Sequence, residues 1–285
     1  MPQSVPPSEP ASAEQPQLSP RAPLNWLLLG PIARECATWG DAPQQLLLQL
    51  RAVQPQVGLF QLDLPGTGRL CGERSPDRIE DLVDGLRGRV RAAALPGPWG
   101  LMASSWASCV AAEWARRYPD ELGAIVLVSP AMRPFTKVLR SVPTGLWGQA
   151  LTKLLGRRAF WRRDAVVWNG QTQLRRASAD ALSRWRELRR QHPVRARNGW
   201  RQMMAVWRFE TSKRRPHPHV LLLAGKGDAW IDWRVSAAIS RAWGAAVRVH
   251  PEAGHDLLLD DPQWVGRSVA EWLLPIGSSG LISQL

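Results

Sequence analysis

The sequence predicts an α/β fold in which a mostly parallel, doubly wound sheet carries an inserted helical cap. Short apolar runs alternate with longer amphipathic stretches, the order typical of a parallel sheet covered by helices on both faces. This alternation stops over residues 133–215, which show helical stretches without a clear strand, and it resumes after His219. We therefore expect an α/β core over residues 23–132 and 216–285 and a cap over residues 133–215.

The elements of the core and the cap follow from the same patterns. Strands are predicted at residues 26–29, 57–62, 99–103, 124–129, 220–224 and 246–250. Helices are predicted at residues 44–50, 76–94, 106–117, 235–243 and 263–273 of the core, and at residues 179–190 and 198–209 of the cap. Because the cap follows the fourth strand, it should cover the carboxyl edge of the sheet, where open α/β sheets bind ligands.

Residues 1–22 are predicted to be a disordered, proline-rich tail. They contain six prolines and few large apolar side chains, so they cannot bury enough surface to offset the entropy of ordering. No apolar run approaches the roughly 18–20 residues that cross a bilayer, and the N-terminus lacks a secretory pattern. Three widely spaced cysteines form neither a disulfide framework nor a metal-ligand pair. These features favour a cytoplasmic protein.

The net charge of +13 is concentrated in the predicted cap. Residues 133–215 hold 21 Lys or Arg against 4 Asp or Glu, which is +17, and the remainder of the chain is therefore at −4. The cap also holds six tryptophans, and residues 146–163 are apolar with a basic end. The tryptophans could form the core of a small helical cap whose arginines are a solvated face. If the charge is functional, interleaved Trp and Arg suit an acidic carrier protein or an anionic membrane surface. Nucleic acid is not expected, because the core is acidic and no groove-reading motif is present.

The candidate nucleophile is Ser105, in the turn between the third predicted strand and the next helix. A nucleophile on such a strained strand-to-helix turn needs small residues two positions before and after it, because the backbone is crowded there. Of the serines in this segment, only Ser105 has two small flanks, Ala103 and Ala107. Alanine resists the positive φ that glycine allows, so we expect a tighter or slightly displaced turn.

The candidate base is His255 and the candidate acid is Asp228. A serine hydroxyl needs a general base at neutral pH, and His255 lies in a loop directly after the last predicted strand. Asp228 follows the strand at residues 220–224, so its carboxylate could orient the imidazole, with Asp232 as the alternative. The other four histidines are interpreted as surface or structural residues. Three aspartates after His255 are predicted to cap the terminal helix: Asp256, Asp260 and Asp261.

Backbone N–H groups that stabilise a developing oxyanion are expected at Trp106 and Ile32. Trp106 comes immediately after the candidate nucleophile, and the loop after the first strand supplies the second donor. Pro31 has no N–H, which leaves Ile32 as the candidate in that loop. A Gly-Pro turn without a catalytic part remains the alternative.

Together these segments resemble the α/β-hydrolase superfamily, and more narrowly a little-characterised group of bacterial proteins with that fold. The motifs that carry the resemblance are Arg-Glu-Cys-Ala-Thr-Trp-Gly at 34–40, Asp-Leu-Pro-Gly-Thr-Gly at 63–68, the Ser105 turn with Glu-Trp-Ala at 113–115, Ala-Gly-His-Asp-Leu at 253–257 and Asp-Asp-Pro at 260–262. The resemblance covers residues 24–275, and the cap matches least. It implies a hydrolase with Ser105, Asp228 and His255 in the usual chain order, and Gly30 stands where most relatives carry His or Arg.

The sequence therefore predicts a serine hydrolase that cleaves a carboxylic ester or thioester of a small or acyl-chain substrate. No metal or organic cofactor is implied. The alternative is a fold relative that has lost catalysis and binds partners through its basic cap, and the two alanines beside Ser105 motivate it.

Overall fold

A computed structural model describes residues 25–136, 170–175 and 178–274 of the chain. The proline-rich tail at residues 1–22 and the apolar, basic stretch at residues 146–163 lie outside the described residues. Three of the six cap tryptophans, Trp147, Trp161 and Trp168, lie outside them as well.

The core is a single parallel sheet, which confirms the predicted fold class. Its strand order is β2-β1-β3-β4-β5-β6, and every neighbouring pair is parallel. The strands are β1 Asn25–Leu29, β2 Gly58–Leu62, β3 Trp99–Ser104, β4 Leu122–Val128, β5 Val220–Gly225 and β6 Ala246–His250. Four central strands are fully buried, whereas β2 and β6 form the edges and are partly exposed.

Successive residues of each central strand point to opposite faces of the sheet. In β1, Leu27 and Leu29 join one apolar cluster, whereas Trp26 and Leu28 join the other. This two-sided burial explains why the strands read as continuous apolar runs in the sequence.

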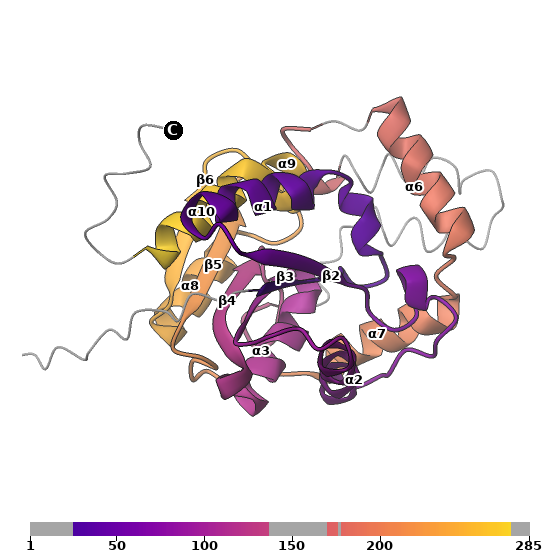
Figure 1. The fold of residues 1–285 in the computed structure, drawn as a ribbon, viewed down its shortest axis with the longest axis horizontal. Helices are drawn as coiled ribbons and strands as arrows, with labels where there is room; N and C mark the ends of the chain where they lie inside the picture. Colours follow the sequence, from indigo (N-terminus) through magenta and orange to yellow (C-terminus); the bar gives the residue numbers. More distant parts are fainter. Residues whose placement is uncertain (1–24, 137–169, 176–177, 275–285) are drawn as a thin grey trace, which may run out of the picture.

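Helices cover both faces (Figure 1). The first cluster takes in residues of α2, α3 and α8, and the second takes in residues of α1, α9 and α10. The α-helices are α1 Ala42–Val53, α2 Ile79–Ala92, α3 Ser108–Arg117, α6 Ala179–Gln191, α7 Ala196–Arg208, α8 Arg234–Trp243, α9 Leu257–Asp260 and α10 Pro262–Leu273. Short 3₁₀ helices are η1 Cys36–Trp39, η2 Gly68–Leu70, η3 Ser105–Ala107 and η4 Pro119–Glu121. No helix among residues 25–136, 170–175 and 178–274 is long and apolar enough to cross a membrane.

Two helices, α6 and α7, follow β4 and precede β5 in the chain, and Figure 1 shows them together at one side of the core. Ser178 caps α6 by accepting a hydrogen bond from the Ala181 N–H at 3.1 Å. Trp185 is buried, and its Nε1–H donates to the carbonyl of Thr38 at 2.8 Å. Trp200 and Trp207 on α7 are instead 67% and 54% exposed.

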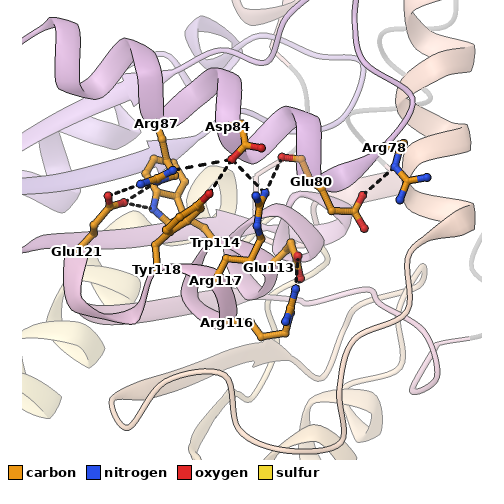
Figure 2. Close-up of polar contacts among 10 residues, drawn as sticks. All are labelled: Arg78, Glu80, Asp84, Arg87, Glu113, Trp114, Arg116, Arg117, Tyr118 and Glu121. Atoms are coloured by element: carbon orange, nitrogen blue, oxygen red, sulfur yellow. Dashed lines mark hydrogen bonds and ion pairs between the residues drawn. The ribbon is translucent and has the colours of Figure 1, made fainter.

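On the face of the sheet that α2 and α3 cover, a polar cluster joins these two helices to the turn that leads into β4 (Figure 2). Glu121 accepts hydrogen bonds from Arg87 at 2.5 and 2.8 Å, from Arg91 at 2.6 Å and from the Trp114 indole at 3.0 Å. The Arg87 guanidinium also lies over the Tyr118 ring. The hydrogen bonds from Arg87 lower the pKa of Glu121 to about 2.

We predict that Glu121→Gln lowers the free energy of unfolding by about 2 kcal/mol at pH 7, because a mostly buried guanidinium loses its carboxylate. The folded pKa lies below the ordinary value of 4.5. The ionic contribution is therefore complete above pH 4.5, and it is lost as the pH falls toward 2. Urea unfolding at pH 7, 5 and 3.5 should show the gap between wild type and variant narrowing toward acid.

Glu187→Gln is the matched control. Glu187 lies on the exposed side of α6, and hydrogen bonds from Arg190 lower its pKa to about 2 as well. An exposed pair is screened by water, so this control should barely change stability. Equal losses in the two variants, or a Glu121 loss that is independent of pH, would contradict the prediction.

Candidate active site

The predicted site residues gather at one edge of the sheet because they follow the carboxyl ends of parallel strands. Ser105 follows β3, Asp228 follows β5 and His255 follows β6, while Ile32 lies in the loop after β1. In a parallel sheet these ends share one edge, and open α/β sheets bind ligands there.

Ser105 is the first residue of η3, in the sharp turn between β3 and α3. Its φ is +56°, a conformation that costs energy for a residue with a side chain. Ala103 and Ala107 are both fully buried, and neither has a positive φ. The expected difficulty with alanine therefore does not arise, because the left-handed residue is Ser105 itself. The flanking positions need small side chains, and a methyl group is small enough.

The structure brings Ser105, His255 and Asp228 into one hydrogen-bonded chain. His255 Nδ1 lies 2.8 Å from Asp228 Oδ2, and His255 Nε2 lies 2.8 Å from Ser105 Oγ. The side chains of His255 and Asp228 are 3% and 2% exposed. An ionised carboxylate accepts from Nδ1–H, which leaves Nε2 as the acceptor for the serine hydroxyl. This arrangement is the one that a serine nucleophile and its base require.

Asp228 is itself held in place by its own turn. Its Oδ1 accepts from the backbone N–H groups of Trp230 and Ile231, both at 2.8 Å. The alternative acid, Asp232, points elsewhere: its carboxylate accepts from the Arg234 backbone at 2.9 Å and pairs with the exposed Arg234 guanidinium at 3.2 Å. Of the two candidate acids, only Asp228 contacts His255.

The loop that carries Asp228 packs directly against the backbone of the loop that carries His255. The N–H of Gly227 donates to the carbonyl of Ala253 at 3.0 Å. A Cβ at Gly225 would lie 2.1 Å from the Ala253 oxygen, and one at Gly227 would lie 2.3 Å from the Glu252 oxygen. Real Cβ atoms do not approach so closely, so both glycines are required for this contact.

Arg34 and Trp39, from the segment at residues 34–40, bind the residue after His255. The guanidinium of Arg34 pairs with the Asp256 carboxylate, which is 3% exposed, and the Trp39 indole N–H donates to it at 3.2 Å. Arg34 also donates to the Gln171 side chain at 2.6 Å. This segment is one of the motifs that carry the family resemblance, but the sequence alone indicates no role for it. These contacts show that it holds the loop that carries His255 against η1.

The predicted helix caps after His255 are correct only in part. Asp261 caps α10 by accepting from Trp264 N–H at 2.8 Å, and Asp256 caps the short helix α9 instead. Asp260 caps no helix. It accepts four backbone N–H groups, from Gly254, Gln173, Leu174 and Arg175, at 2.7–3.1 Å. This buried carboxylate joins the histidine loop to the segment at residues 173–175, a tertiary contact that helix-capping rules cannot anticipate.

Trp230 is a site residue that the sequence reasoning missed. Its ring stacks on the His255 imidazole with centroids 5.3 Å apart and an angle of 26° between the planes. Beside it lies a cavity of about 610 Å³ that borders Asp228 and Trp230. Its other walls include Phe135, Trp233 and Val235, with Lys226, Asp232 and Arg234. In the sequence, only its position two residues after the candidate acid Asp228 points to Trp230 as a site residue.

Ile32 and Trp106, the candidate oxyanion donors, are partly buried and pack against the same apolar cluster. The Ile32 N–H donates to no acceptor among the described residues. The next residue, Ala33, has a φ of +56°.

The two buried cysteines, Cys36 and Cys109, do not offer a competing nucleophile inside the core. Burial raises the pKa of the Cys36 thiol well above its usual value, and it does the same for Cys109. Such thiols stay protonated and unreactive. Within the described ranges, no group of three or more His, Cys, Asp or Glu side chains is arranged to hold a metal ion.

Comparison with known proteins shows which family and which folds the chain matches. A family profile described as serine aminopeptidase, S33, matches residues 48–262. A search of the curated proteins finds no match. Three similar solved structures are the protein lip1 of Acinetobacter baumannii AYE, described as a candidate lipase, an esterase from Thermogutta terrifontis and the haloalkane dehalogenase DbeA from Bradyrhizobium elkani USDA94.

These structures share the fold at low sequence identity. The first has a TM-score of 0.68 and 20% identity, over 87% of this chain and 83% of that one. The esterase has a TM-score of 0.60 and 20% identity, over 88% and 89% of the two chains. The dehalogenase has a TM-score of 0.61 and 20% identity, over 87% and 89%. Identity at this level shows the fold alone.

We predict that Arg34→Met lowers the free energy of unfolding by about 3 kcal/mol, because the buried Asp256 carboxylate loses its cation. Adding Asp256→Asn should cost much less in the Arg34→Met background than in wild type, with a coupling energy of about 2 kcal/mol in a double-mutant cycle. Urea unfolding measures all four proteins. Arg234→Met, which breaks the exposed pair with Asp232, is the control and should change little. Additive losses at 34 and 256 would show that the pair contributes nothing specific.

Proposed function

Because the chain belongs to the α/β-hydrolase family described as serine aminopeptidase, S33, we propose that it is a serine hydrolase that cleaves a carboxylic ester or thioester. The observation that carries this proposal is the hydrogen-bonded chain from Ser105 Oγ through His255 to Asp228 at 2.8 and 2.8 Å. Three residues that lie up to 150 positions apart in the chain meet in the order that such catalysis needs.

In the proposed reaction, Ser105 Oγ attacks the carbonyl carbon of the substrate while its proton passes to His255 Nε2. Asp228, which keeps its negative charge, stabilises the imidazolium through Nδ1–H. The imidazolium then protonates the departing alcohol or thiol as the C–O or C–S bond breaks. Water, deprotonated by His255, attacks the acyl-enzyme, and the serine regains its proton as the acid leaves. The backbone N–H groups of Trp106 and Ile32 would bind the oxyanion in both halves of the reaction.

The acyl group itself is proposed to carry both an apolar and a polar part. The cavity beside Asp228 and Trp230 has an aromatic and aliphatic wall formed by Phe135, Trp233 and Val235 and a charged wall formed by Lys226, Asp232 and Arg234. Ser105 and His255 do not line this cavity, so it is proposed to hold the acyl chain and not the reacting carbonyl. The charge of +17 over residues 133–215 supports delivery of that acyl group by an acidic carrier or from an anionic membrane surface. Carrier-bound and free thioesters compared at low and high salt test this part of the proposal. A preference for the carrier-bound form that fails to weaken with salt would contradict it.

A fluorophosphonate probe tests the chemistry directly. We expect wild type to be labelled and Ser105→Ala to remain unlabelled. Asp228→Asn should lower kcat by about 10⁴-fold, because the imidazole loses the partner that fixes its tautomer. Asp232→Asn, a matched change four residues away, should keep kcat within about threefold of wild type, because the Asp232 carboxylate pairs with Arg234 at the cavity wall and makes no hydrogen bond to His255.

Substrates should include p-nitrophenyl esters of graded chain length, the corresponding thioesters and aminoacyl p-nitroanilides, since the family description names aminopeptidases. Labelling that survives Ser105→Ala, or equal effects at 228 and 232, would refute the assignment of these residues. Well-folded wild type that neither labels nor turns over any ester would favour the alternative, a binding protein that has lost catalysis.

A further inference from the structure

Helix α7 buries two amide side chains beside the apolar Ala205 and Val206, and it exposes two tryptophans. Asn198 and Gln202, one turn apart, are 4% and 0% exposed, whereas Trp200 and Trp207 are more than half exposed. Burying an amide costs free energy unless its donor and acceptor are both satisfied. The contacts of these two amides therefore show what the inner face of α7 does.

Gln202 joins two loops at the carboxyl edge of the sheet. Its Oε1 accepts from the backbone N–H of Ala33 at 2.7 Å, and its Nε2–H donates to the carbonyl of Pro65 at 2.9 Å. Ala33 lies in the loop after β1, directly after Ile32, and Pro65 lies in the loop after β2. One side chain of α7 thus fixes the loop that holds a candidate oxyanion donor.

The backbone at Ala33 requires such support. A φ of +56° costs about 1 kcal/mol or more for alanine and persists only where the surroundings hold it. The Ala33 N–H lies in the same rigid peptide plane as the Ile32 carbonyl. The Ile32 N–H lies in the preceding plane, that of the Pro31–Ile32 peptide. Fixing the Ile32–Ala33 plane through Gln202 restricts the ψ rotation of Ile32 and so limits how the Ile32 N–H, which has no acceptor among the described residues, turns relative to that plane.

We propose that Gln202 is a positioning residue for the oxyanion loop: by holding Ala33, it limits the movement of the adjoining Ile32, so that the Ile32 N–H stays directed at the carbonyl oxygen of the substrate. This inference rests on the proposed serine-hydrolase function. It predicts that loss of the Gln202 hydrogen bonds weakens binding of the transition state more than binding of the substrate, because the oxyanion forms only during the reaction.

Asn198 provides a matched control on the same helix. Its Nδ2–H donates to the carbonyl of Glu73 at 2.8 Å, and its Oδ1 accepts from the N–H of Ser75 at 3.1 Å. It is a buried amide with two backbone partners, as Gln202 is, but its partners lie in the loop before α2. A variant at Asn198 reports the effect of loosening α7 without touching Ala33.

The experiment compares Gln202→Met with Asn198→Leu, each nearly isosteric and each without the amide. Gln202→Met should lower kcat by about tenfold or more with KM within about twofold, because a displaced oxyanion donor acts on kcat. Asn198→Leu should keep kcat within about threefold while losing similar thermal stability. Gln202→Glu, which keeps an acceptor for the Ala33 N–H, should retain more of kcat than Gln202→Met.

Hydrogen exchange at the backbone separates this inference from the proposed function. Peptides that cover residues 30–35 should exchange faster in Gln202→Met alone, and peptides that cover residues 72–76 should exchange faster in Asn198→Leu alone. Equal losses of kcat in both variants, or unchanged exchange at residues 30–35 in Gln202→Met, would overturn the positioning role. If wild type lacks serine-dependent hydrolysis, the proposed function fails, and the exchange result alone decides whether Gln202 holds the loop.

Discussion

The close backbone contact between the loops after β5 and β6 is the constraint on which the rest of the site depends. Gly225 pairs with His250 in the sheet register, and Gly227 then donates to the Ala253 carbonyl, so the two loops stay in contact beyond the ends of their strands. Asp228 and His255 follow this contact by only a few residues. Their 2.8 Å hydrogen bond is therefore a consequence of two backbones that approach closely enough to need glycine.

Three buried carboxylates hold the loops after β5 and β6 in place around this contact. Asp228 accepts hydrogen bonds from two backbone N–H groups. Asp256 is bound by Arg34 and Trp39. Asp260 accepts four backbone N–H groups from two segments of the chain. Each charge would be costly to bury alone, but each has donors that compensate for its desolvation. The imidazole of His255 contacts one of these carboxylates, Asp228, and that hydrogen bond sets its orientation.

Helices α6 and α7 contribute to the site through a few polar contacts with the core loops. Trp185 donates to Thr38, His192 lies 3.0 Å from the buried Glu35, and Gln202 holds Ala33. Burial raises the pKa of Glu35, and the nearby His192 opposes that shift. Arg201 and Arg208 of α7 add ion pairs with Asp77 of the core.

The sequence by itself determined the parallel α/β core, because strand burial on two faces and helix amphipathicity both leave periodic, local patterns. It also selected Ser105, Asp228 and His255, since residues that directly follow parallel strands must share one edge. It could not choose between Asp228 and Asp232 with certainty, assign Arg34, or notice Trp230, Asp260 and Gln202. Those roles arise from contacts between segments far apart in the chain, where the direction of a side chain and the approach of two backbones decide the outcome. Only the packed tertiary structure sets both.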